Sequence, residues 1–206
     1  MEIINALLHI DTYIISLIAS YGVLIYLILF LIIFAETGLI ITPFLPGDSL
    51  LFVAGTIAGQ GSLNVVSIFI LLSLAAILGD SLNYALGNYL GERFFVRKKL
   101  IKQEHLERTK EFYRKHGGKT IILARFMPII RTFAPFIAGV GKMDYRKFLS
   151  FNIIGGLCWV SLFVLGGYFF GTIPIVKNNL TLIIVLIIIT SFIPPIINFL
   201  KHGKNE

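Results

Sequence analysis

Five charged side chains interrupt the apolar stretches of this sequence: Glu36, Asp48, Asp80, Arg125 and Arg131. A charge at the centre of a bilayer costs at least about 2.5–3.5 kcal/mol on insertion scales, so such charges usually pair or line the path of an ion or substrate. We therefore expect both arginines to have partners. The two acids of the 36–49 segment are the natural candidates.

The residue types indicate what such a cluster could bind. An arginine stays charged when it is desolvated, and its planar fork binds a phosphate through two hydrogen bonds. Burial can bring a carboxyl group toward protonation near neutral pH, which suits a proton relay. Arg125 and Arg131 would then bind a phosphate, while Glu36 and Asp48 exchange protons. The structural alternative is that the acids only neutralise the arginines, although buried ion pairs stabilise poorly compared with apolar packing.

Other polar residues are candidates for lining the same path. Asp80, Asn83 and Tyr84 stand close together in one apolar stretch, and Asn152 stands in another. For Asp80, a satisfied hydrogen bond between helices is an equal alternative. Asn152 and Trp159 are interpreted mainly as packing residues.

No motif of a known enzyme class accompanies these residues. The sequence lacks the G-x-S-x-G, Walker and H-E-x-x-H motifs. Its four histidines are scattered, and the single cysteine, Cys158, excludes an internal disulfide and a thiolate metal site within one chain. We expect no catalysis, no cofactor and no bound metal.

The composition indicates the class of protein. Of the 206 residues, 56% are hydrophobic and 14% are charged, and the mean hydropathy is +0.86. A soluble domain of this length could not bury so much apolar surface. We therefore expect a single all-α, multi-pass membrane domain covering 1–206. Uncharged runs long enough to cross a bilayer as helices occur at 12–35, 49–79, 148–176 and 178–200.

The pattern of apolar residues predicts surface helices, spanning helices and two interruptions. The two interruptions are 36–49, which contains Pro43, Pro46 and Gly47, and 124–139, which contains Pro128 and Pro135. Each proline removes a backbone hydrogen-bond donor and disfavours a continuous helix. Amphipathic surface helices are expected at 3–18 and 100–116, and spanning helices at about 64–90, 147–170 and 178–200.

The charge distribution indicates whether 124–139 crosses the membrane. Ten of the 18 basic residues fall within 93–119, and basic residues mark cytoplasmic loops. If 124–139 enters and turns back, the basic residues at 142–147 and at the C-terminus stay on that same side. We therefore predict a re-entrant hairpin that lines a cavity, with 92–119 and the C-terminus cytoplasmic. The cluster at 93–119 would attract anionic lipid headgroups, and no nucleic-acid motif accompanies it.

Short sequence echoes indicate a duplicated unit. FVAG at 52–55 resembles FIAG at 136–139, and LGNYLG at 86–91 resembles LGGYFFG at 165–171. Each unit would hold a surface helix, a re-entrant hairpin and one spanning helix, so the second copy is inserted upside down. Repeat one covers about 1–91 and repeat two about 100–171, followed by the extra spanning helix. Inverted repeats whose broken elements meet near the midplane are typical of transporters.

Three motifs resemble the DedA family of bacterial membrane proteins, whose fold is shared with the SNARE-associated or VTT group. They are ETGL…PFLPGDS at 36–49, GD…Y…G at 79–87, and RFMPIIRTFAPFIAG…W at 125–159. The resemblance implies two facing re-entrant hairpins and proton-dependent lipid transport, and it assigns functional roles to Glu36, Asp48, Arg125 and Arg131. The acid after Pro-Gly is Asp here and Glu in many members, which should alter reach more than chemistry.

The expected function is that of a proton-coupled flippase in the bacterial inner membrane. It would move a phosphate-bearing lipid between leaflets for envelope lipid recycling, with undecaprenyl phosphate as the first choice. A phospholipid flippase or scramblase acting on phosphatidylethanolamine is the next choice. A cation/proton antiporter in pH and membrane-potential homeostasis and a non-transporting scaffold are further alternatives, and homo-oligomers are compatible with all of them.

Overall fold

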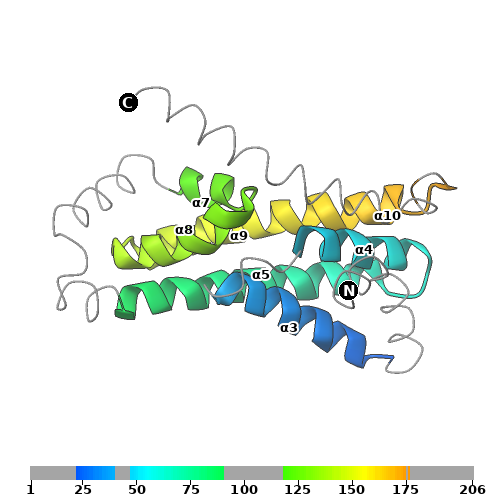
Figure 1. The fold of residues 1–206 in the computed structure, drawn as a ribbon, viewed down its shortest axis with the longest axis horizontal. Coiled ribbons are helices and arrows are strands. Elements are labelled where there is room, and N and C mark those ends of the chain that lie inside the picture. Colours follow the sequence, from blue (N-terminus) through cyan, green and yellow to red (C-terminus); the bar gives the residue numbers. More distant parts are fainter. Residues whose placement is uncertain (1–21, 40–46, 91–117, 175, 177–206) are drawn as a thin grey trace, which may run out of the picture.

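The computed structural model describes residues 22–39, 47–90, 118–174 and 176, and in these ranges every regular element is a helix (Figure 1). Several expectations fall outside the described residues. They are the surface helices at 3–18 and 100–116, the spanning helix at 178–200, almost all of the basic segment 93–119, and Pro43 and Pro46.

Two long helical rods run antiparallel along the length of the molecule (Figure 1). The first is α5, Val65–Leu90. The second is α9, Tyr145–Val160, which continues through a π-helical turn at Ser161–Leu165 into α10, Gly166–Phe170. Each rod has 26 residues and is apolar enough to cross a membrane. At 1.5 Å per residue each is about 39 Å long, more than the ~30 Å of a hydrocarbon core. The helices predicted at 64–90 and 147–170 are thus confirmed as helices.

Two pairs of shorter helices lie against the rods. The first pair is α3, Leu24–Gly38, and α4, Gly47–Gly59. The second is α7, Lys119–Ala124, and α8, Pro128–Val140. In Figure 1 the α3–α4 pair lies toward one end of the long axis and the α7–α8 pair toward the other. The first interruption therefore separates α3 from α4 and the second separates α7 from α8, whereas the re-entrant placement of both pairs in a membrane stays a prediction.

The packing crosses between the two halves of the sequence. Helix α4 packs against α10 and the π-helical turn, while α8 packs against α5. Glycines make these contacts close. A Cβ added at Gly55 would meet the carbonyl oxygen of Val164, and one at Gly139 would meet the carbonyl oxygen of Tyr84. One helix of each pair is thereby held by the rod of the other half, while α3 packs against α5 and α7 packs against α9.

Two apolar clusters form the core, and a polar layer lies between them. Along α5, Ala76 belongs to the first cluster and Tyr84 to the second, and Asp80 lies one helical turn from each. Along the second rod, Phe148 belongs to the second cluster and Trp159 to the first, with buried Asn152 between them. The polar side chains are therefore concentrated in the middle of both rods.

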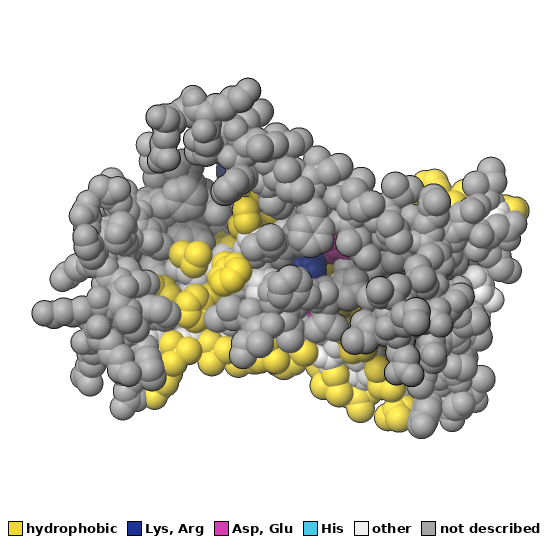
Figure 2. All heavy atoms as spheres, in the orientation of Figure 1, with side chains coloured by type: hydrophobic (Ala, Val, Ile, Leu, Met, Phe, Trp, Pro, Cys, Tyr) yellow, Lys and Arg dark blue, Asp and Glu magenta, His cyan; other side chains and the backbone are white. Residues whose placement is uncertain are grey.

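The outer surface of the described helices is largely apolar. On α5 a stripe of exposed side chains repeats at every fourth residue: Val66, Ile70, Leu74 and Leu78. Figure 2 shows hydrophobic side chains over much of the described part of one face, with basic and acidic side chains coming into view together near its middle. An apolar stripe facing outward and charges facing inward are what a lipid environment favours.

Candidate functional site

One arginine joins the two helix pairs. Arg131 lies on α8, and its Nη2 donates to Oε1 of Glu36 in the last turn of α3. Its Nη1 donates to Oδ1 of Asp48 in the first turn of α4, at 2.6 Å. The positive end of the α4 dipole also favours a carboxylate there. Only 1% of the Glu36 side chain and 9% of the Arg131 side chain are exposed, so the ion pairs are desolvated. This pairing matches the expectation from the sequence.

Gly47 brings the chain close to Glu36. Its backbone N–H donates to Oε1 of Glu36 at 3.2 Å. A Cβ at this position would overlap the Glu36 carboxylate. The glycine of the predicted break thus lets the backbone reach the acid directly, in addition to beginning α4.

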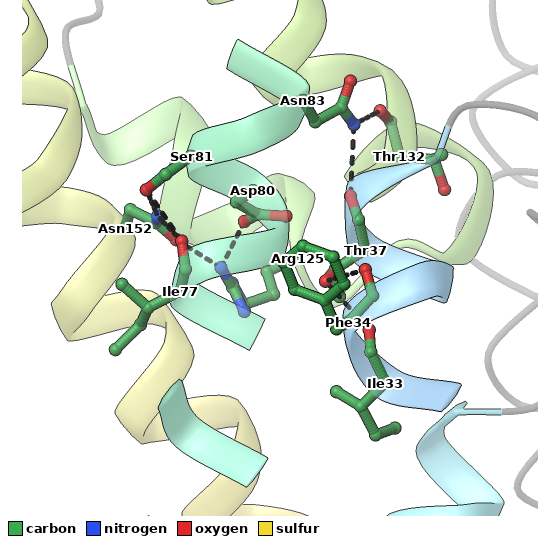
Figure 3. A network of polar contacts seen from close by, with 10 residues as sticks. All are labelled: Ile33, Phe34, Thr37, Ile77, Asp80, Ser81, Asn83, Arg125, Thr132 and Asn152. Carbon is green, nitrogen blue, oxygen red and sulfur yellow. Dashed lines mark hydrogen bonds and ion pairs between the residues drawn. The ribbon is translucent and has the colours of Figure 1, made fainter. Parts of the chain in front are cut away.

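The second arginine forms a separate cluster. Arg125 lies in the break between α7 and α8 and is 3% exposed. Its Nη2 donates to Oδ2 of Asp80 and to Oδ1 of Asn152 (Figure 3). The Asn152 amide in turn donates to the carbonyl oxygen of Ile77 at 3.0 Å. The expectation that the acids of 36–49 would partner both arginines is therefore wrong for Arg125, because α5 and α9 supply its partners instead.

Arg125 retains unused donors. Its Nε and Nη1 are buried without a hydrogen-bond partner in the described structure. Two glycines of α9 make room beside them, since a Cβ at Gly155 would be 3.5 Å from Nε and one at Gly156 would be 3.5 Å from Nη1. Unpaired buried donors are costly and call for an explanation. Each of these two N–H groups can donate one charge-assisted hydrogen bond to a phosphate oxygen.

Trp159 connects the two clusters. The centroid of its ring lies 5.1 Å from Cζ of Arg131 and 5.8 Å from Cζ of Arg125, within the range of a cation–π interaction. Its Nε1–H donates to Oδ1 of Asp48 at 2.9 Å. The interpretation of Trp159 as mainly a packing residue is thus incomplete. Its partners come from three other segments, so spacing along its own helix could not have revealed them.

Asn83 and Tyr84 bind the backbone. The Asn83 amide donates to the carbonyl oxygens of Thr37, at 3.2 Å, and Thr132, at 2.7 Å (Figure 3). The Tyr84 hydroxyl donates to the carbonyl oxygen of Met143. These bonds tie α5 to the end of α3, to α8 and to the turn after α8. Their participation in a substrate path stays a prediction.

The two prolines of the second interruption differ in effect. Pro128 is the first residue of α8 and follows Met127 in an extended conformation, so the chain breaks there as predicted. Pro135 lies inside α8, which continues to Val140. Pro135 therefore does not end the helix, and its part in a re-entrant hairpin stays a prediction. Having no N–H, Pro135 instead leaves the carbonyl of Arg131 without its usual helical partner.

The polar layer holds more acid than base. Three carboxylates, of buried Glu36 and Asp80 and of partly buried Asp48, face two guanidiniums, which leaves one negative charge in excess when all five groups are ionised. Oε2 of Glu36 has no partner among the described atoms. In the described part of the chain no group of three or more His, Cys, Asp or Glu side chains is arranged to hold a metal ion. The arrangement can bind a proton on a carboxyl group, and an anion once an arginine is released.

Comparisons with known proteins match the chain to one family model and to several relatives, some of which are named as membrane proteins. The VTT domain matches residues 45–169. Protein DedA of Escherichia coli strain K12 is 54% identical over 206 residues, which cover 98% of this chain and 94% of that protein. An uncharacterized membrane protein of Mycobacterium leprae is 41% identical over 168 residues, 81% of this chain and 75% of that protein. Inner membrane protein YqjA of E. coli K12 is 34% identical over 154 residues, 74% and 70% of the two chains. No solved structure matches the chain.

Proposed function

The chain belongs to the DedA family of membrane proteins, and on that premise we propose that it is a proton-coupled transporter of a phosphate-bearing lipid. Undecaprenyl phosphate is the preferred substrate and phosphatidylethanolamine the next. Arg125 and Arg131 bind the lipid phosphate, and Glu36 and Asp48 are the carboxyl groups that exchange protons with it. The protein acts in the bacterial inner membrane as a flippase, not as an enzyme.

The observation that carries the proposal is the occupied state of Arg131. Both of its terminal nitrogens are bound by carboxylates of the other helix pair. A phosphate cannot bind these two nitrogens until one carboxylate dissociates from Arg131. Protonation of Glu36 or Asp48 removes that carboxylate's charge and also the excess negative charge of the layer. Proton uptake and anion binding are thereby linked at one residue.

Arg125 provides the second half of the phosphate site. Its Nε and Nη1 have no partner in the described structure, and Trp159 lies against both guanidiniums. A phosphate that reaches Arg125 and the released Arg131 gains charge-assisted hydrogen bonds from both guanidiniums. The charge that makes burial of these arginines costly is then balanced by the substrate.

The membrane arrangement that fits this function is an inverted repeat. The α3–α4 pair enters from the outer face and the α7–α8 pair from the cytoplasmic face, and their ends meet at the polar layer. The segment 92–119 and the C-terminus lie in the cytoplasm, where 93–119 attracts anionic headgroups. Broken helices that meet near the midplane suit alternating access around a fixed site.

Cation/proton antiport is the second candidate, and the excess carboxylate favours it. Three acids against two arginines would attract a cation as well as a proton. A scaffold that transports nothing would need no unpaired buried donors, which makes it the weakest candidate.

The test uses purified protein in liposomes. Movement of labelled undecaprenyl phosphate and of phosphatidylethanolamine between leaflets is measured with and without an inward proton gradient, beside empty liposomes. We expect gradient-dependent movement of a phosphate lipid, and we expect the variant that combines Glu36→Gln with Asp48→Asn to lose its pH dependence. Proton flux that depends on an added cation, without lipid movement, would favour the antiporter. Absence of both fluxes would favour the scaffold.

A further inference from the structure

We propose that Trp159 is a positioning residue of the phosphate site, an inference that rests on the transport function proposed above. Its indole N–H fixes Asp48 on Arg131, so that Glu36 is left as the carboxyl group that takes up the exchanged proton. On the sequence alone both acids are expected to exchange protons, whereas in this proposal their roles differ.

Two donors bind one oxygen of the Asp48 carboxylate. Its Oδ1 accepts from Nη1 of Arg131 at 2.6 Å and from Nε1 of Trp159 at 2.9 Å. Hydrogen bonds to the charged form of a carboxyl group favour that form. The position of Asp48 in the first turn of α4 acts in the same direction. The two hydrogen bonds therefore hold the Asp48 carboxylate against Arg131 and Trp159.

Glu36 has a vacant oxygen. Its Oε1 accepts from Arg131 and from the backbone of Gly47, whereas Oε2 is buried without a partner in the described structure. The charged groups that face Glu36 are Arg131 on α8 and Asp48 on α4, with Asp80 on α5 bound to Arg125. A proton can bind Oε2 without displacing any hydrogen bond, and it weakens the hold of Glu36 on Arg131.

The Trp159 ring lies where its environment changes when Arg131 is released from Glu36. Its ring lies over both guanidiniums, so a movement of Arg131 toward a phosphate changes the indole environment. The π-helical turn begins two residues later, at Ser161. Such turns are rare and are often found at functional sites.

The only tryptophan of the chain makes the first test direct. The intrinsic fluorescence of wild-type protein in detergent is titrated with farnesyl phosphate, a short phosphate lipid, and separately with farnesol and inorganic phosphate. We expect a saturable change with farnesyl phosphate, none with farnesol, and a lower apparent affinity in Arg131→Lys. An equal response to inorganic phosphate would support the place of Trp159 but assign the site to free phosphate. Thermal stabilisation by farnesyl phosphate with unchanged emission would overturn the role of Trp159 and leave lipid binding intact.

The second test separates the indole N–H from the ring. Trp159→Phe keeps an aromatic ring beside the arginines and removes the donor to Asp48. In liposomes, the pH at half-maximal lipid movement should rise by about one unit or more. Without the hydrogen bond from Trp159, Asp48 holds Arg131 less firmly, so protonation of Glu36 releases Arg131 at a lower proton concentration. Glu36→Gln should abolish the pH dependence, whereas Asp48→Asn should lower the rate at every pH and keep the dependence.

The control is Phe163→Leu. The Phe163 ring contacts Trp159 edge-on at 6.3 Å between centroids, so its loss disturbs packing without removing the donor to Asp48. This variant should lower stability and leave the pH midpoint unchanged. The same midpoint in Trp159→Phe and wild type, with transport preserved, would overturn the proposal. Absence of lipid movement in wild type would instead sink the proposed function, so the two failures are distinguishable.

Discussion

Arg131 is the residue on which the buried charges balance, because it is bound by acids from both α3 and α4. Arg131→Ala leaves Glu36 and Asp48 buried without their counter-charge, and we expect a loss of about 3–5 kcal/mol in unfolding free energy. Arg131→Lys keeps the charge but cannot reach both acids with separate nitrogens, so an intermediate loss is expected.

The matched control for this prediction is Arg146→Ala, since Arg146 is exposed on α9. Its unfolding free energy should stay within about 0.5 kcal/mol of wild type. The unfolding free energies of all three variants are measured by denaturation in detergent, which is followed by circular dichroism. Equal stability of Arg131→Ala and Arg146→Ala would mean that the ion pairs of Arg131 do not form.

The partner of Arg125 is tested by a double-mutant cycle. The structure pairs Arg125 with Asp80, so Arg125→Gln and Asp80→Asn should be coupled by about 0.5–3 kcal/mol in unfolding free energy. The cycle of Arg125→Gln with Glu36→Gln should give a coupling at the low end of that range or below it. If Arg125 is coupled more strongly to Glu36 than to Asp80, the result would support the sequence-based expectation that an acid of the 36–49 segment pairs with Arg125.

At this scale, the sequence identified the charged residues but not their partners. An ionised side chain in an apolar run must be paired, which is why Glu36, Asp48, Asp80, Arg125 and Arg131 could be singled out. Which acid meets which arginine depends on how the helices cross, and one sequence does not contain that information. For the same reason, the sequence did not reveal the contacts of the Trp159 indole with Asp48 and the two arginines.

Close approach of helix backbones is the main feature at the scale of elements, and two neighbouring glycines allow a sharp test. A Cβ at Gly167 would overlap the carbonyl oxygen of Phe52 on α4, whereas at Gly166 the nearest atom lies 4.0 Å away. Gly167→Ala should therefore cost about 1–3 kcal/mol through overpacking. Gly166→Ala should be neutral or stabilising by up to about 1 kcal/mol, because alanine favours a helix. Similar stabilities of the two variants, measured by thermal unfolding, would contradict this packing.

The glycine contacts also show where the sequence echoes are informative. Gly167 faces the carbonyl of Phe52, and Gly87 faces the carbonyl of Phe136. Phe52 and Phe136 begin the FVAG and FIAG segments, so the two similar segments make matching contacts in the two halves. The LGNYLG and LGGYFFG echo, however, aligns Gly87 with Gly166. The shift of one residue coincides with the π-helical turn, whose i to i+5 bonds take in one residue more than an α-helical turn.

For the molecule as a whole, the position of the polar layer along the rods fits a transport path. Asp80 lies about 4 Å from the midpoint of α5, and Trp159 about 2 Å from the midpoint of the second rod, at 1.5 Å per residue. When both rods span a bilayer, the ion pairs therefore lie near its midplane. Hydropathy predicted both rods, because a run of apolar residues is enough to identify a span. The course of α8 through Pro135 was not predicted, because packing against α5 holds a helix that proline alone would disfavour.

The orientation of the α7–α8 pair decides whether the molecule is an inverted repeat. Lys119, at the start of α7, and Lys142, after α8, are both exposed, as is Gln60 after α4. In a Cys158→Ala background, single cysteines at these three positions are labelled with a membrane-impermeant maleimide, in intact spheroplasts and after permeabilisation. A re-entrant pair places 119 and 142 on the cytoplasmic side, where labelling needs permeabilisation, while 60 is labelled in intact spheroplasts because α5 crosses between them. Labelling of 142 but not 119 from outside would mean that the segment crosses the bilayer, and the inverted repeat would be lost.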